Sequence, residues 1–115
     1  MSLYSENLIV WQKAFILAEK VHILLKRFPK EEQYALTDQI RRSSVSVPSN
    51  IAEGSGRGSN NEKDHFFHIA KGSVMELHTQ LLLAKKFGYI DESSQEELAS
   101  LIEEIVRMLV SMTQK

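Results

Sequence analysis

The 115-residue chain is 43% hydrophobic and 25% charged, as expected for one globular domain. It has no cysteine, which excludes disulfides and thiolate chemistry and favours a reducing, cytoplasmic location. Its net charge of −1 excludes the strongly basic composition of an obligate nucleic-acid binder. We expect no membrane span, because no apolar run is long enough, and no signal peptide, because "MSLYSENLIVW" lacks a basic stretch before an apolar one.

Apolar residues recur at helical spacing in four segments, at about 6–28, 32–54, 61–87 and 94–113. Pro29 ends the first segment, and the breaker "GSGRGSNN" follows the second. Gly88 caps the third, and the S-x-x-E spacing from Ser94 to Glu97 predicts the start of the fourth. No segment alternates with a period of two. The short connections predict an antiparallel, up-down-up-down four-helix bundle that occupies 1–115 as one domain.

The first segment carries more than one apolar face. Its expected core stripe is Trp11, Ala14, Ala18, Val21, Leu25 and Phe28. A second row, at a seven-residue spacing between two polar columns, consists of Ile9, Ile16 and Ile23. Three isoleucines in one row indicate a contact surface, which we interpret as a self-association interface. The alternative is that the end of the fourth helix or the N-terminal tail covers them.

The second segment contains "QIRRSSVSVPSNIAEGSGR" at residues 39–57, in which Ile40, Val47 and Ile51 keep the spacing of a buried helical face. Pro48 lacks an amide donor, so it predicts a kink that costs about 3 kcal/mol in an unadapted helix. The neighbouring serines leave room for this bend and for a close neighbour. The glycines follow a helix and lack a G-K-[ST] ending, which argues against a phosphate-binding loop.

Polar residues of the same segment allow two interpretations. We expect Asn50 and Glu53 to join a structural network of hydrogen bonds between helices, in which Arg42 could pair with Glu53. Arg41, Arg42 and Arg57 are also candidate nucleic-acid contacts, and the sequence leaves both readings open for them.

The third and fourth segments supply the remaining core stripes. We expect Ala70, Val74, Leu77, Leu81 and Ala84 from the third, and Leu98, Leu101, Ile105, Met108 and Met112 from the fourth. Charge is divided between them. Residues 1–90 carry 12 Lys+Arg against 9 Asp+Glu, whereas residues 91–115 carry 2 against 6. A basic face is therefore expected only on the first three helices.

Catalytic and metal-binding signals are weak. Two E-x-x-H spacings occur, Glu19–His22 and Glu62–His65, but they lie at levels about 15 Å apart along parallel helices, which argues against a di-iron centre. His65 and His68 have no evident third ligand. With no cysteine and no legible Ser-His-Asp arrangement, we predict no enzyme activity, no metal and no cofactor.

Three stretches carry a family resemblance over roughly residues 8–90: "LIVWQKAFILAEKV", "FPKEEQYALTDQIRRSSVSVPSNIAEGSGR" and "FFHIAKGSVMELHTQLLLAKKFGYI". Their most specific pieces are Q-I-R-R, S-N-I-A-E-G and I-A-x-G-S-x-x-E-L. In these pieces the chain resembles the four-helix-bundle family named after proteins encoded in intervening sequences of 23S ribosomal RNA. The fourth segment carries no comparable signature.

This resemblance implies a left-handed antiparallel bundle that assembles into a ring-like homopentamer. A relative of the family, the accessory protein of diversity-generating retroelements, is a basic pentamer that works with nucleic acid. By that similarity Arg41, Arg42 and Arg57 are expected to contact RNA or DNA. We therefore predict a cytoplasmic homo-oligomer that binds RNA or DNA, and the alternative is a protein–protein adaptor or assembly scaffold that binds neither.

Overall fold

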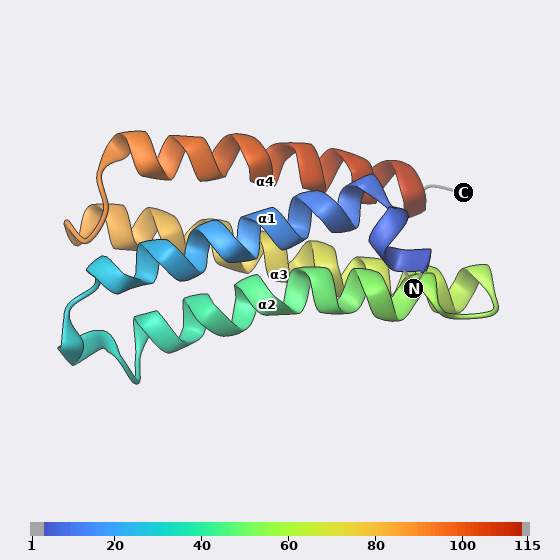
Figure 1. The fold of residues 1–115 in the computed structure, drawn as a ribbon, viewed down its shortest axis with the longest axis horizontal. Coiled ribbons are helices and arrows are strands. Elements are labelled where there is room, and N and C mark those ends of the chain that lie inside the picture. The colour runs from blue at the N-terminus through green and yellow to red at the C-terminus, as the bar shows by residue number, and fades with distance from the viewer. Residues whose placement is uncertain (1–3, 114–115) are drawn as a thin grey trace.

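The computed structural model describes residues 4–113 and contains four α-helices joined by short connections (Figure 1). The helices are α1 (Ile9–Leu24), α2 (Leu36–Ser55), α3 (Asn60–Lys86) and α4 (Glu92–Thr113). Three short 3₁₀ helices accompany them: η1 (Tyr4–Asn7), η2 (Leu25–Arg27) and η3 (Lys30–Glu32). No β-strand occurs within residues 4–113. The predicted all-α fold with four helices is confirmed.

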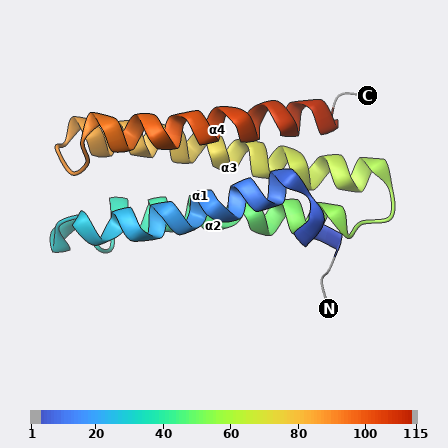
Figure 2. The same cartoon turned by 45° about the horizontal axis from the view of Figure 1, so that its top comes forward.

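Each helix runs antiparallel to the next, as the two views show (Figure 1, Figure 2). α2 and α4 both pack against α1, and both pack against α3, so α1 and α3 occupy opposite corners of the bundle. The molecule is 43 Å long and 26 by 22 Å across. The connections α1–α2 and α3–α4 lie at one end, and the connection α2–α3 lies at the other. The hand of the bundle and the kink at Pro48 stay predictions.

Apolar side chains from all four helices form one core. The largest that are completely buried are Leu17, Val21, Ile40, Val47, Ile51, Val74, Leu77, Leu81, Ile105 and Leu109. The predicted stripe of α3 is buried throughout. On α4, however, the predicted Leu101, Met108 and Met112 are only partly buried, and Ile102 and Leu109 are buried in their place. The two stripes share Leu98 and Ile105, so the helical pattern alone did not separate them.

Helix ends follow local side-chain chemistry. α4 begins before the predicted Ser94, because the carboxylate of Asp91 accepts a hydrogen bond from the Ser94 amide (2.7 Å) and serves as the N-cap. The capping box lies instead at the start of α3. There the Ser59 hydroxyl accepts from the Glu62 amide (3.2 Å) and also donates to the Glu62 carboxylate (3.1 Å). The S-x-x-E spacing of Ser59 and Glu62 thus caps a helix, whereas the same spacing of Ser94 and Glu97 does not.

The C-terminus of α3 confirms the predicted glycine cap. Gly88 has a φ of +83°, and its amide donates to the Lys85 carbonyl, while the Tyr89 amide donates to the Ala84 carbonyl. These two bonds make a Schellman motif, which needs a left-handed residue at this position. α2 starts later than predicted, at Leu36, because η3 and a turn occupy the residues after Pro29.

α2 and α3 make the closest helix pair, and Gly54 sets their approach. A Cβ atom on Gly54 would lie 2.8 Å from Cε1 of Phe67 and 3.1 Å from Cβ of Phe66. Phe67 is buried, so its ring has little room to move. Glycine is therefore required by packing at this point, which gives a physical meaning to the last residue of S-N-I-A-E-G.

Candidate functional site

The outer face of α1 carries large apolar side chains that the rest of residues 4–113 leaves exposed. The three predicted interface residues Ile9, Ile16 and Ile23 are 54%, 42% and 56% exposed. Phe15, which the heptad pattern did not single out, is also exposed on this helix. Ile9 borders a shallow groove against the C-terminal end of α4 and yet remains half uncovered. We name Ile9, Phe15, Ile16 and Ile23 the α1 face.

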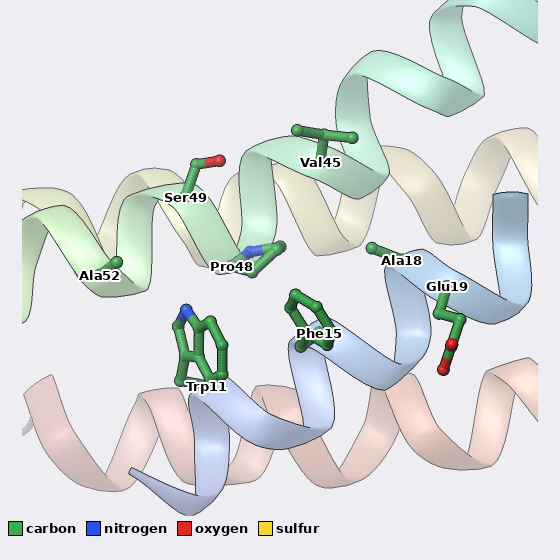
Figure 3. Close-up of a pocket in the computed structure, with 8 residues that line it drawn as sticks. All are labelled: Trp11, Phe15, Ala18, Glu19, Val45, Pro48, Ser49 and Ala52. Carbon is green, nitrogen blue, oxygen red and sulfur yellow. The ribbon is translucent and has the colours of Figure 1, made fainter. Parts of the chain in front are cut away.

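An apolar groove of about 520 Å³ lies between α1 and α2, beside the α1 face (Figure 3). Trp11 and Phe15 of α1 stack with their ring centroids 5.0 Å apart. Pro48 projects from α2 toward these two rings, whereas Glu19 points away from α2. The remaining lining residues are Ala18, Val45, Ser49 and Ala52. Pro48 is buried, so its ring contributes to the packing of α2 against α1. α2 continues through Pro48 although proline lacks an amide donor.

Small polar side chains cross the α2–α3 contact. The Ser43 hydroxyl lies 2.7 Å from the Gln80 amide oxygen, and the hydroxyls of Ser46 and Ser73 are also 2.7 Å apart. Asn50 donates from Nδ2 to the carbonyl and to the hydroxyl of Ser46, at 2.9 Å each. Asn50 therefore belongs to a hydrogen-bonded chain that reaches α3 through Ser46.

Glu53, the other residue predicted for this network, lies outside it. Its carboxylate pairs with the guanidinium of Arg57, four residues later. Arg42 pairs with Asp38 at 2.8 Å, and not with Glu53 as the sequence suggested. Arg42 and Arg57 each have a carboxylate four residues earlier in the sequence. Side chains at this spacing lie next to each other on a helix, so the pair forms without a contribution from another helix.

The three candidate nucleic-acid contacts do not converge. Arg41 and Arg42 lie near the start of α2 and share one carboxylate, that of Asp38. Arg57 lies beyond the other end of α2, about 20 Å away along the axis at 1.5 Å per residue. Its guanidinium carbon stands 4.7 Å from the centre of the Phe66 ring, a cation–π contact that holds it against α3. Only Arg41 and Arg42 form a common patch.

The acidic fourth helix is partly neutralised by α1. Lys13 pairs with Glu104 at 2.8 Å, and Lys20 pairs with Glu97 at 2.9 Å. The hydrogen bond from Lys20 to the Glu97 carboxylate raises the pKa of Lys20 above its ordinary value. Basic residues of α1 therefore pair with acidic residues of α4 within one chain, and these two lysines are not free to form a basic surface.

Neither a metal site nor a membrane span is visible in the described part of the chain. Within residues 4–113, no three His, Cys, Asp or Glu side chains come close enough together to hold a metal ion. None of the helices in this range is sufficiently long and apolar to cross a bilayer.

Comparisons with known proteins agree with this fold. A protein of unknown function from the S23 ribosomal protein family of Bacteroides thetaiotaomicron has a similar crystal structure, with a TM-score of 0.86 and 24% identity over 93% of this chain and 100% of that one. The sequence matches no curated protein. Residues 6–111 match the model of the 23S rRNA-intervening sequence proteins. Because this match includes nearly the whole bundle, the chain belongs to the 23S rRNA-intervening sequence protein family.

Proposed function

We propose that this chain is a non-enzymatic, cytoplasmic bundle that assembles into a homo-oligomer through the α1 face, with a ring of five copies as the expected form. The observation that carries this proposal is the exposure of Ile9, Phe15, Ile16 and Ile23 along one helix. A single exposed isoleucine is ordinary on a protein surface, whereas several exposed apolar side chains along one helix are typical of an interaction site. The family resemblance supports the number five.

The energetics favour such a contact. Complete burial of an exposed isoleucine or phenylalanine side chain stabilises an assembly by about 1.5–3 kcal/mol, and the α1 face offers four such side chains, each already about half buried. The neighbouring groove adds the apolar surfaces of Trp11 and Val45. A closed ring of five copies makes five contacts in four association steps, so the closing contact adds no further loss of translational freedom.

Light scattering on two matched variants tests the location of this contact. Ile16→Lys places a charge in the α1 face, so we expect the oligomer to dissociate. Ile69→Lys makes the same change on α3, at nearly the same exposure (40% against 42%). The control should keep the wild-type mass. An Ile16→Lys variant with an unchanged mass would contradict the assignment of the contact to α1.

A second candidate function, binding of RNA or DNA, is favoured by the patch at the start of α2. Two guanidinium groups pair with one carboxylate there, that of Asp38, and the Arg42 side chain is 79% exposed, beside a groove that Glu76 also lines. One such patch would bind phosphate weakly, but several copies on one oligomer act together through effective concentration.

Salt dependence separates this binding function from a scaffold that binds no nucleic acid. Fluorescence anisotropy should show an affinity for RNA or DNA that falls steeply as salt rises, because phosphate contacts release counterions. Reversal of both charges, with Arg41→Glu and Arg42→Glu, should abolish binding. Binding that is flat with salt or survives both reversals would contradict binding through this patch, and the absence of any binding would favour the scaffold.

A further inference from the structure

The connections α1–α2 and α3–α4 lie at the same end of the bundle (Figure 1, Figure 2), and aromatic side chains from both meet there. The Tyr89 ring lies 5.3 Å from the Phe28 ring and 5.9 Å from the Phe87 ring, measured between centroids. Tyr34, from the α1–α2 connection, is 89% exposed, and Phe87 is 53% exposed. Both connections therefore present a large ring to solvent at the same end.

The cluster is held in place by directed bonds. The Tyr89 hydroxyl donates to Oε2 of Glu32 (2.7 Å), and the other oxygen of Glu32 accepts from the Leu36 amide (3.3 Å). The hydrogen bond to Glu32 also raises the pKa of Tyr89 above its ordinary value. The Schellman motif at Gly88 fixes the path of the chain between Phe87 and Tyr89. The rings of Phe28, Phe87 and Tyr89 thus form a platform that links the two connections, and Tyr34 stands exposed on one of them.

Three exposed lysines lie close in sequence to these rings. Lys26, Lys30 and Lys86 are exposed and form no ion pair with any residue between 4 and 113. Of the carboxylates at this end, Glu92 pairs with Lys85, whereas Glu32 and Asp91 accept hydrogen bonds from neutral groups and keep their negative charge, as does the exposed Glu31. A lysine without an ion pair therefore lies within a few residues of each exposed ring in the sequence: Lys30 before Tyr34, and Lys86 before Phe87.

We propose that this end of the bundle binds single-stranded nucleic acid, with bases stacked on Tyr34 and Phe87 and phosphates held by Lys26, Lys30 and Lys86. The inference rests on the nucleic-acid function proposed above and assigns it a second surface. Helix dipoles explain cations at the C-termini of α1 and α3, but they do not explain the exposed rings. Stacked bases do, because aromatic platforms beside a positive groove are the usual way to hold an unpaired strand.

Binding of fluorescein-labelled oligouridine to the full chain tests this site by fluorescence anisotropy. Loss of one stacking ring costs about 1–3 kcal/mol per base, so Phe87→Ala and Tyr34→Ala should each weaken affinity by about 5- to 150-fold. Tyr4→Ala is the matched control, because Tyr4 is also an exposed tyrosine (66%) but lies at the opposite end of the bundle. Phe87→Tyr keeps an aromatic ring and should retain binding.

The outcomes separate this site from the α2 patch. Weaker binding in both ring variants, with Tyr4→Ala unchanged, supports the platform. Wild-type affinity in both ring variants overturns it, and if the charge reversals at Arg41 and Arg42 still abolish binding, the proposed function stands without the platform. A duplex RNA that binds as tightly as oligouridine also overturns the single-strand assignment. No binding of oligouridine by the wild type at low salt overturns both proposals.

Discussion

The α2–α3 contact and the outer face of α1 are built from opposite kinds of side chain. Between α2 and α3, a glycine allows close approach, and the hydroxyl of Ser43 meets the amide of Gln80 in a buried hydrogen bond. On the outer face of α1, large apolar side chains such as Ile16 and Ile23 point into solvent. The first region has its packing and its hydrogen bonds completed within one chain, whereas the second has apolar surface that one chain does not use.

This difference teaches where single-chain stability and assembly reside. Changes at the α2–α3 contact should alter the free energy of unfolding of one chain. Changes on the α1 face should leave that free energy nearly unchanged and alter the number of copies instead. Four predictions, in order of decreasing effect, test this division.

Gly54→Val should cause the largest loss, about 1–3 kcal/mol in the free energy of unfolding, because the new side chain overlaps the buried Phe67. Urea unfolding measures this change. The control is Gly72→Ala, in the middle of α3, where a Cβ would meet nothing within 4 Å. That variant should gain up to about 1 kcal/mol from helix propensity. A Gly54→Val chain as stable as the wild type would show that α2 and α3 can move apart.

Ser43→Ala should cost about 1 kcal/mol, because the buried oxygen of Gln80 loses its donor. Urea unfolding of the single variant and of Ser43→Ala with Gln80→Met measures the pair. The double variant removes the unsatisfied oxygen as well, so it should recover part of the loss. A further loss in the double variant would mean that Gln80 also stabilises the contact in ways other than its hydrogen bond to Ser43.

Ile23→Ser should change the stability of a single chain by no more than about 0.5 kcal/mol, since the residue is 56% exposed. The measurement must be made at protein concentrations low enough to separate the copies, because assembly itself stabilises the fold. A loss above 1 kcal/mol at the dilute limit would show that the α1 face contributes to the fold of one chain.

The smallest effect is expected at the border between α1 and α4. The folded pKa of Lys20 is raised by Glu97, so the pair stabilises the fold fully below the ordinary lysine pKa of 10.5 and loses this contribution as pH rises through the folded pKa. Above pH 10.5, the midpoint temperature of thermal unfolding should therefore fall less with rising pH in Lys20→Gln than in the wild type. Parallel curves for the two chains would contradict the coupling.

Much of the fold could be predicted from the sequence, because apolar spacing and cap residues are local signals. Gly88 was recognised as a cap, since few residues other than glycine adopt a positive φ easily. The start of α4 was misplaced, because Asp91 and Ser94 both have suitable cap chemistry and only the folded backbone selects between them. The prediction placed Leu101 in the core, but Ile102 is buried there. Both residues fit the helical spacing, and only the rotation of α4 in the fold selects between them.

The candidate sites were harder to predict, because they depend on distances between helices. The exposure of Ile9, Ile16 and Ile23 followed from heptad spacing, but the neighbouring groove required knowing how Pro48 faces α1. The carboxylate partners of the arginines have i−3 and i−4 spacings, which are local signals in the sequence. The aromatic platform gave no sequence signal, because its rings come from two connections that only the fold brings together.

The central claim is that the α1 face is completed by other copies of the chain. Native mass spectrometry of the unmodified protein tests it most directly, because it counts subunits without any variant. The account predicts one dominant species of five chains at micromolar concentration. A spectrum with single chains alone at that concentration would contradict the account and leave the α1 face without a partner.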